Sequence, residues 1–586
     1  MSILIFKMKS LTQRHGEYRV HRRKIAVFLC VFSIILFIPF LFPLPVSAQL
    51  IHYSSIPCNV NKFSREFYFN VRNEDSIVPQ NLHPEIKPCY YKELHIPVIS
   101  GKFRLNIRYE KYGYHPCYST ILAPWSFLKT MNLFVDVSPG INVANDNFIS
   151  ENNFGFNVSN LYWLKPDSKT PGIGLSYYYS ASNFPDYLQS IINKSHVVPG
   201  QGYAHFNKSG NSYNNLSFYI AKNAGKYFTF EGGYGKNFFG DGFRSLFLSD
   251  AACSYPYLKI TTTIWKIKYV NLYTNFKDIT AGYDNWFKAE NKYGAFHFLS
   301  WDATKRLNIN LFEAVIMAGK SGNHNRGFDV NYFNPIIFYR PVEFSLGSPD
   351  NDLLGLGTHY KIGKKHVFYG QLLIDDFVLN DVKEGFKHLL HPKDSTIKWG
   401  SWFNKQAWQL GYKYFDVAGI KYLNFQTEFN YVRPYTYSHR EVLENYAHFN
   451  QPLADPLGSN FWESVSFLKY SVDKWYFEVE YMHYLTGLDS NGTHFGQDIF
   501  KPTYDTYMPD VHNIVVPEFY NKVGQGIKTT VNFISLKTSY LIWPPMNLRI
   551  EAGYIYRTQK SIIENKTTNY FFLGIKTSLD NRYYDL

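Results

Sequence analysis

Two segments of this chain concentrate side chains that could bind a sugar. Aromatic rings stack on the apolar faces of sugars, and charged groups or imidazoles bond to the hydroxyls. The first segment contains Phe238, Phe239, Asp241, Arg244 and Asp250. The second contains Tyr435, Tyr437, His439, Arg440, Tyr446 and His448. We predict a ligand-binding role for these residues, because each segment combines stacking faces with hydrogen-bonding groups.

Other motifs have only part of the pattern of a phosphate or metal site. The glycine-rich stretch 232–242 lacks Gly-Lys-Ser/Thr and a strand-to-helix context, which favours a turning loop over a phosphate site. Asp350 and Asp352 lack the 12-residue ligand spacing of a calcium loop. His388 and His391 lack further ligands at metal spacing. The sequence therefore predicts no metal ion and no cofactor.

A hydrolase site could be assembled from two acidic residues and a second loop. Asp375 and Asp376 are adjacent, and His439 with Glu441 could supply the remaining acid–base groups. Nothing in the spacing requires that these four residues meet. We therefore predict that the protein is not an enzyme and keep a hydrolase as an alternative.

The elements that position these residues must be mainly strands. The chain has 586 residues, of which 19% are aromatic, and it has only five cysteines. Few long apolar runs argue against a bundle of membrane helices, dense Tyr and Phe argue against disorder, and few cysteines argue against a disulfide scaffold. Aromatic and β-branched residues suit strands, and the aromatic excess favours a barrel with membrane interfaces.

The first 48 residues have the pattern of an export signal. A basic stretch at 7–24 precedes an apolar stretch at 25–38, and three prolines follow before the small residues 46–48. This order predicts a signal peptide that is cleaved before Gln49. An uncleaved membrane anchor is the alternative, since the apolar character continues to residue 42.

Charge and cysteine content constrain the partners and the compartment. Residues 1–48 hold seven Lys or Arg and one Glu, so the net charge falls from +13 to +7 on cleavage. This charge favours acidic lipid headgroups or acidic polysaccharide and is too weak to indicate nucleic acid. Cys58, Cys89 and Cys117 lie near the expected mature N-terminus, where one disulfide or free thiols are both compatible with the sequence.

Several segments alternate between apolar and polar residues almost without error. The clearest are 408–414, 423–431, 474–482 and 546–556. Period two over nine to eleven residues matches a tilted membrane strand with one face toward lipid and one toward a lumen. A soluble β-sandwich would show the same alternation.

Connection lengths separate these two architectures. Short turns are expected near 223–225, 264–265, 303–305, 363–365, 418–420, 471–473 and 543–545. Long connections are expected at about 235–255, 277–291, 319–352, 378–406, 433–460, 486–526 and 558–569. Outer-membrane barrels have short periplasmic turns and longer outer loops, whereas a sandwich has no reason to sort loops by end.

Counting strands back from the C-terminus gives the size of the barrel. If the final strand, 570–579, runs inward, 15 strands extend back to about Asn214. Weaker candidates at 131–138, 152–160 and 172–180 make 18, an even number that places both barrel ends in the periplasm. We therefore predict an all-β transmembrane barrel over 131–586 of about 18 antiparallel strands. Residues 49–130 are expected to form a plug or a small periplasmic module.

Five blocks of the sequence resemble a known family. Residues 198–206, 233–269, 331–357, 369–382 and 431–463 are similar to gliding-motility members of the Wzi-like capsule-assembly family of outer-membrane barrels. The resemblance implies an 18-stranded barrel in the cell outer membrane and a non-enzymatic role at the cell surface. It also implies binding of capsular polysaccharide or support of surface gliding. It supplies no residue-level ligand motif.

The resulting expectation is a barrel whose outer loops display the candidate residues. The expected partners are outer-membrane lipid and either a surface polysaccharide or gliding and adhesion proteins, with no nucleic acid. One alternative is that these loops only pack into the barrel mouth. Two alternative functions are an outer-membrane solute channel and an outer-membrane hydrolase.

Overall fold

A computed structural model describes most of the chain beyond residue 130. The described ranges are 131–144, 147–160, 171–182, 184–207, 210–225, 227–280, 289–321, 324–336, 350–376, 378–490, 493–503, 518–543, 548–576 and 584–586. The predicted signal peptide lies outside these ranges. So does the segment 49–130, which contains Cys58, Cys89 and Cys117. Among the described residues, no helix is both long and apolar enough to cross a bilayer.

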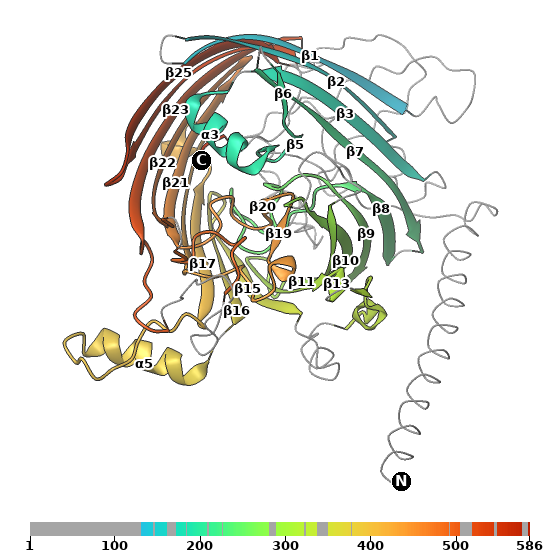
Figure 1. The fold of residues 1–586 in the computed structure, drawn as a ribbon. Helices are drawn as coiled ribbons and strands as arrows, with labels where there is room; N and C mark the ends of the chain where they lie inside the picture. Colours follow the sequence, from blue (N-terminus) through green and yellow to red (C-terminus); the bar gives the residue numbers. More distant parts are fainter. Residues whose placement is uncertain are drawn as a thin grey trace.

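One closed antiparallel sheet forms the body of the protein (Figure 1). The sheet has 19 strands, one of which is the three-residue β6 (His205–Asn207), paired only with β7 (Gly210–Ala224). The other 18 form the wall. It closes where residues 140–144 of β1 (Met131–Ala144) pair with residues 570–574 of β25 (Asn565–Lys576). The predicted barrel of 18 strands is therefore confirmed.

The other wall strands follow in chain order, each paired with its neighbours. They are β2 (Asn147–Asn160), β3 (Gly172–Ser182), β8 (Phe228–Gly235), β9 (Tyr255–Ile264), β10 (Ile267–Asp278), β11 (Glu290–Trp301), β12 (Leu307–Ala318), β15 (Asn351–Ile362), β16 (His366–Asp376), β17 (Lys405–Tyr414), β18 (Leu423–Val432), β21 (Phe461–Val472), β22 (Trp475–Leu488), β23 (Ile527–Trp543) and β24 (Leu548–Lys560). The three weaker candidates of the sequence are β1, β2 and β3.

Small elements lie in the connections between wall strands. The helices are α3 (Asp186–Ser195) and α5 (Leu379–Leu390), with 3-10 turns η4 (Val330–Phe333), η5 (Val417–Gly419) and η6 (Val442–Glu444). Three short hairpins pair β4 (Val197–Val198) with β5 (Gly202–Tyr203), β13 (Lys320–Ser321) with β14 (His324–Asn325), and β19 (Ala447–His448) with β20 (Gln451–Pro452).

The two faces of the wall show why the alternating segments form a barrel rather than a soluble sandwich. On β18, the polar residues Asn424, Gln426, Glu428 and Asn430 point inward and are buried. On β22, the apolar residues at 475, 477, 479 and 481 are exposed on the outside. A soluble sandwich would bury its apolar face, whereas lipid requires the opposite arrangement. The wall is therefore a membrane barrel.

The connections are sorted between two rims, largely as predicted. The turn rim joins strands through 225–227, 265–266, 302–306, 363–365, 415–422 and 473–474. The opposite loop rim carries 236–254, 279–289, 319–350, 377–404, 433–460 and 489–526. The prediction of a long connection at 558–569 is wrong, because β24 and β25 are joined by residues 561–564 alone. The polar residues that suggested a loop there continue the two strands as a paired hairpin.

We expect the loop rim to face the outside of the cell. A cysteine at Ile562, which is 91% exposed in the β24–β25 turn, should react with an impermeant maleimide on intact cells. A cysteine at Lys364, exposed in a turn-rim connection, should react only after the outer membrane is permeabilised. The reverse labelling pattern would contradict this orientation.

Candidate functional site

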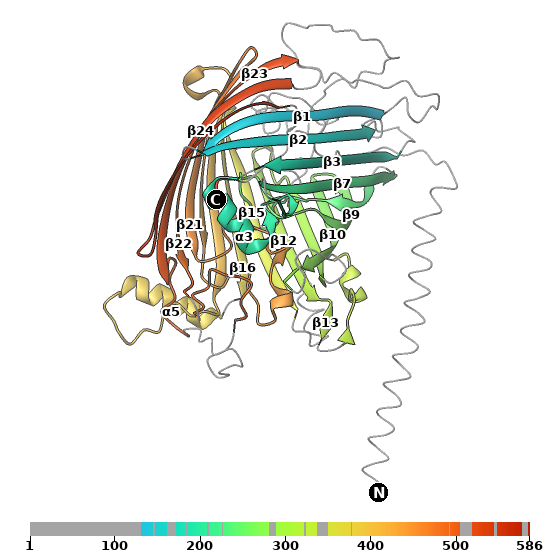
Figure 2. The same ribbon diagram turned by 45° about the horizontal axis from the view of Figure 1, so that its top comes forward.

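Chain segments folded inward from the rims fill the lumen, and we call them the plug. They are residues 184–204 with α3, residues 236–254, residues 433–460 and the C-terminal tail 584–586. Figures 1 and 2 show α3 and the C-terminus inside the ring of strands. Phe239, Phe247 and Tyr446 of the plug share one hydrophobic core with the wall residues Phe298 and Phe312. The lumen is therefore packed like a protein interior.

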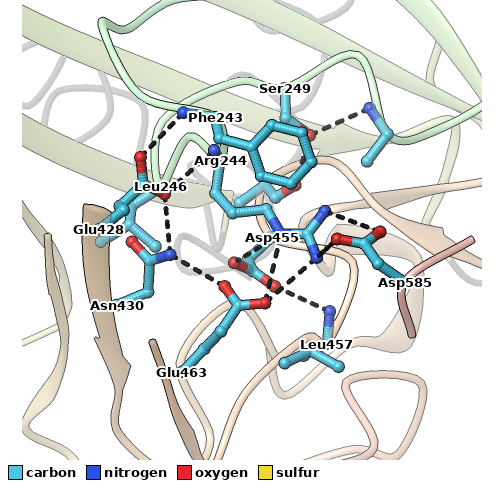
Figure 3. A network of polar contacts seen from close by, with 12 residues as sticks. Phe243, Arg244, Leu246, Ser249, Glu428, Asn430, Asp455, Leu457, Glu463 and Asp585 are labelled. Atoms are coloured by element: carbon cyan, nitrogen blue, oxygen red, sulfur yellow. Dashed lines mark hydrogen bonds and ion pairs between the residues drawn. The ribbon is translucent and has the colours of Figure 1, made fainter. Parts of the chain in front are cut away.

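Arg244 lies at the centre of a buried ion network in the plug (Figure 3). One guanidinium nitrogen lies 2.7 Å from an Asp585 oxygen and 3.1 Å from a Glu463 oxygen, and Asp455 is 3.9 Å from Nε. The Arg244 side chain is only 1% exposed. Burial by itself would lower the pKa of Arg244, but Asp585, Glu463 and Asp455 raise it well above its ordinary value. The guanidinium therefore stays charged and joins the plug, the wall and the tail.

Inward polar residues of the wall bind the backbone of this plug segment. Glu428 accepts hydrogen bonds from the backbone N–H groups of Phe243 and Arg244 at 2.8 and 3.1 Å (Figure 3). Asn430 donates to both Glu428 and Glu463 at 2.9 Å. A Cβ atom at Gly242 would lie 2.3 Å from a Glu428 oxygen, so the close approach requires glycine. These wall residues supply the partners that a buried loop backbone needs.

The second plug segment holds the first in place. The hydroxyls of Tyr437 and Tyr446 donate to the carbonyls of Leu246 and Phe247 at 2.8 and 2.7 Å. The two tyrosine rings stack with centroids 5.6 Å apart. The backbone N–H of Tyr437 donates to Asp375 at 2.7 Å, which ties this segment to the wall.

His448 is also a packing residue. Its Nδ1 accepts from the backbone N–H of Lys277 at 3.0 Å, which leaves Nε2 to donate to the Ser254 carbonyl at 3.1 Å. Burial lowers the pKa of His448 to about 3, so the ring is neutral at physiological pH. Asp241 similarly lies 3.0 Å from a buried wall imidazole, that of His359.

The structure buries nine of the eleven residues that we predicted for ligand binding. The buried residues are Phe238, Phe239, Asp241, Arg244, Asp250, Tyr435, Tyr437, Tyr446 and His448. Only His439, which is partly exposed, and Arg440, which is exposed, reach the surface. The expectation that outer loops display all eleven residues is therefore wrong. The nine buried residues instead fit the alternative, in which the loops pack into the barrel mouth. Mixed aromatic and charged residues are as suited to a polar core as to a sugar site.

The residues considered for hydrolysis and calcium binding are also engaged within the fold. Lys405 lies 3.7 Å from an Asp375 oxygen and 2.9 Å from an Asp376 oxygen. His439 faces Glu444 at 3.0 Å rather than either aspartate. Arg326 binds both oxygens of Asp350. Within the described ranges, no group of three His, Cys, Asp or Glu residues is arranged to hold a metal ion.

A group of exposed and partly exposed aromatic residues lies where two long loops meet at the loop rim. We call it the rim aromatic cluster, and it consists of Trp399, Trp402, Phe403, Phe519 and Tyr520. The Trp399 and Tyr520 rings lie 5.8 Å apart, and the Trp402 and Phe403 rings lie 5.1 Å apart. Tyr520 is 53% exposed and Phe403 is 39% exposed. The cluster is therefore an aromatic surface accessible from the loop rim.

Backbone contacts and cations shape this cluster. Trp402 N–H donates to the Glu518 carbonyl at 3.1 Å and Tyr520 N–H donates to the Trp399 carbonyl at 2.6 Å. The Lys398 ammonium lies 5.2 Å from the centre of the Phe519 ring, and Arg433 donates to the Ser401 carbonyl at 3.2 Å. None of the five residues of the cluster was predicted from the sequence to bind a ligand. Two tryptophans within the five residues 399–403 were the available signal.

Comparison with known proteins gives the class of this fold. No protein-family model and no curated protein sequence matches the chain. Among solved structures, Wzi of Escherichia coli is similar with a TM-score of 0.50 and 11% identity, over 90% of this chain and 99% of Wzi. OprD of Pseudomonas aeruginosa has a TM-score of 0.39 and 10% identity over 76% of this chain and 94% of OprD. The chain thus has the fold of an outer-membrane β-barrel.

The likeness to Wzi extends over 90% of this chain. Wzi is described as an outer-membrane protein involved in group 1 capsule assembly and as a carbohydrate-binding β-barrel. The likeness concerns the fold, since the identity is low.

Proposed function

We propose that this protein is a non-enzymatic recognition barrel of the outer membrane that binds a surface polysaccharide at its loop rim. The observation that carries the proposal is the rim aromatic cluster, whose rings are exposed or partly exposed at the mouth of a barrel whose lumen holds a packed plug. Flat aromatic faces bind sugar rings without a deep pocket. The carbohydrate-binding activity described for Wzi supports the proposal by analogy of fold.

The charge around the cluster favours an acidic polysaccharide. Lys398 lies over the Phe519 ring of the cluster, Arg433 binds the Ser401 carbonyl next to it, and Arg440 is exposed on the neighbouring plug segment. Guanidinium and ammonium groups bind carboxylates or phosphates through charge-assisted hydrogen bonds. His439 and Arg440 therefore remain part of the proposed site, whereas the nine buried candidates belong to the packing of the plug.

The finer biological role comes from the sequence resemblance. The blocks 233–269 and 431–463 are similar to the gliding-motility protein RemB, and these blocks build much of the plug and its contacts. We include support of gliding or of capsule assembly in the proposal. Export through a cleaved signal at 1–48 and a plug or periplasmic module at 49–130 are also part of it.

A solute channel is the second candidate function. The barrel wall itself would allow it, but the Arg244 network and the shared core pack the plug against the wall. Conductance of the intact protein in planar bilayers distinguishes the two functions, since a recognition barrel with this plug should conduct poorly.

Replacing Trp399 and Trp402 together by alanine should weaken binding of acidic surface polysaccharide by roughly five- to 150-fold. Each ring contributes roughly 0.5–1.5 kcal/mol through stacking. Binding to the purified polysaccharide by calorimetry and retention of polysaccharide on cells measure the effect. Trp265→Ala is the matched control, because Trp265 is 72% exposed on the turn rim. Equal affinity of the double variant and the parent would contradict the site.

A further inference from the structure

Helix α5 has an exposed apolar face with no partner among the described residues. It begins three residues after β16 ends at Asp376, in the loop-rim connection between β16 and β17. Figures 1 and 2 both show α5 extending sideways beyond the barrel wall, across the strand direction rather than along it. At 12 residues it is roughly 18 Å long, since a helix rises about 1.5 Å per residue.

The apolar residues of α5 lie on one face and are open to the surroundings. Leu379, Phe386, Leu389 and Leu390 are 59%, 65%, 74% and 75% exposed. Their spacing of three, four and seven residues places them together on a helix. No residue of α5 is buried. Apolar side chains gain free energy from leaving water, so this face has a strong tendency to be covered.

The opposite face of α5 is the one attached to the protein. His388 stacks on the Trp399 ring with centroids 4.4 Å apart and an angle of 9° between the planes. Glu384, also on this face, forms an ion pair with Lys387. A helix of a soluble protein packs its apolar face inward. Because α5 is attached through its polar face, its apolar face points away from the barrel.

Two observations identify a lipid surface as the cover. Lys383 and Lys387 flank the apolar face and are exposed, which suits the phosphates of anionic lipid headgroups. The strands next to α5 carry the outward apolar residues Leu372 and Leu410 in their middle, which are exposed on the lipid-facing wall. Helix α5 therefore adjoins, at the loop rim, two strands whose outer faces are lipid-facing.

We propose that α5 is an interfacial anchor that lies on the membrane leaflet at the loop rim. Its leucines and Phe386 insert at the boundary between headgroups and acyl chains, and Lys383 and Lys387 bind lipid phosphates. The His388–Trp399 stack then holds the rim aromatic cluster close to the leaflet surface. This anchoring does not depend on the proposed polysaccharide binding.

The test places an environment-sensitive fluorophore on each face of α5 in the full mature chain. The parent carries Ser at Cys58, Cys89, Cys117 and Cys253, and the probe is attached at Leu389→Cys or, as the matched control, at Glu384→Cys. The refolded protein is inserted into vesicles of phosphatidylcholine with phosphatidylglycerol. A nitroxide quencher on the lipid acyl chains should quench the probe at 389 several-fold more than the probe at 384.

A second variant tests whether Lys383 and Lys387 bind lipid phosphates. Lys383→Glu combined with Lys387→Glu should reduce the quenching at 389 in vesicles that contain phosphatidylglycerol and leave it unchanged in phosphatidylcholine alone. Equal quenching at both probe positions would overturn the proposal. Shielding at 389 that depends on protein concentration rather than on lipid would also overturn it, because a second copy would then be the cover. Polysaccharide binding, measured separately, distinguishes this failure from failure of the proposed function.

Discussion

Arg244→Ala is expected to open the lumen of the barrel while the wall remains folded. The substitution leaves three carboxylates, those of Asp455, Glu463 and Asp585, without the guanidinium that they share in the buried network. Breaking a buried ion pair from one side costs about 3–5 kcal/mol, because the remaining charges stay desolvated. The wall does not need the network, since its strands are joined by a closed ladder of hydrogen bonds.

Two measurements report the opening. Single-channel conductance in planar bilayers should rise from near zero to a clearly resolved open level. The thiol of Cys253 is buried in the plug with its pKa raised to about 12 by burial, so it should react slowly with maleimide in the parent and quickly in the variant. The other mature cysteines are replaced by Ser for this measurement.

Lys320→Ala is the control for Arg244→Ala. Lys320 pairs with Glu290 at the loop rim with both side chains partly exposed, and such pairs contribute about 0–1 kcal/mol. It should change neither conductance nor labelling. An Arg244→Ala protein that conducts and labels like the parent would show that the network does not close the lumen.

Deleting the tail residues 584–586 is expected to loosen the same plug through a different segment. The tail supplies Asp585 to Arg244, the Leu586 carbonyl to Arg557 at 2.8 Å, and the Tyr584 carbonyl to the Tyr187 hydroxyl at 2.5 Å. Hydrogen bonds to charged groups contribute about 1.5–3 kcal/mol each. The deletion should therefore raise Cys253 labelling by an amount comparable to that of Arg244→Ala.

A double-mutant cycle tests whether the tail acts through Arg244. Groups that share one network show non-additive effects. Deleting the tail in the Arg244→Ala background should add less than deleting it in the parent, because Asp585 has already lost its partner. Lys320→Ala again serves as the control and should behave like the parent. Full additivity would show that the tail and Arg244 act independently.

The candidate glycan-binding residues show the limit of reasoning from the sequence. The blocks at 233–269 and 431–463 contain two of the plug segments, and the aromatic candidate residues in them are buried. Tyr435, Tyr437 and Tyr446 are fully buried, so their replacement would disturb the plug rather than a surface. A loop of this composition is compatible with a buried position in the lumen and with an exposed position at the surface. Only the wall groups that bind its backbone decide between the two positions.

The sequence alone determined the wall of the barrel. Period-two alternation in segments such as 423–431 is a local property, and each strand needs only a neighbour and a lipid-facing side to realise it. The count of 18 strands and the sorting of loops between rims follow from the same local pattern. Even the error at 558–569 was local, because polar strand residues beyond the lipid resemble a loop.

The tertiary structure alone decided what fills the barrel and which rings remain exposed. Arg244 meets Glu463 and Asp585 across 219 and 341 residues of chain, and no short-range pattern encodes such pairings. The direction of a loop depends on whether the wall offers buried partners to its backbone, as Glu428 does for residues 243 and 244. That complementarity exists only once the barrel has closed, because closure brings the distant polar faces of its strands around one lumen.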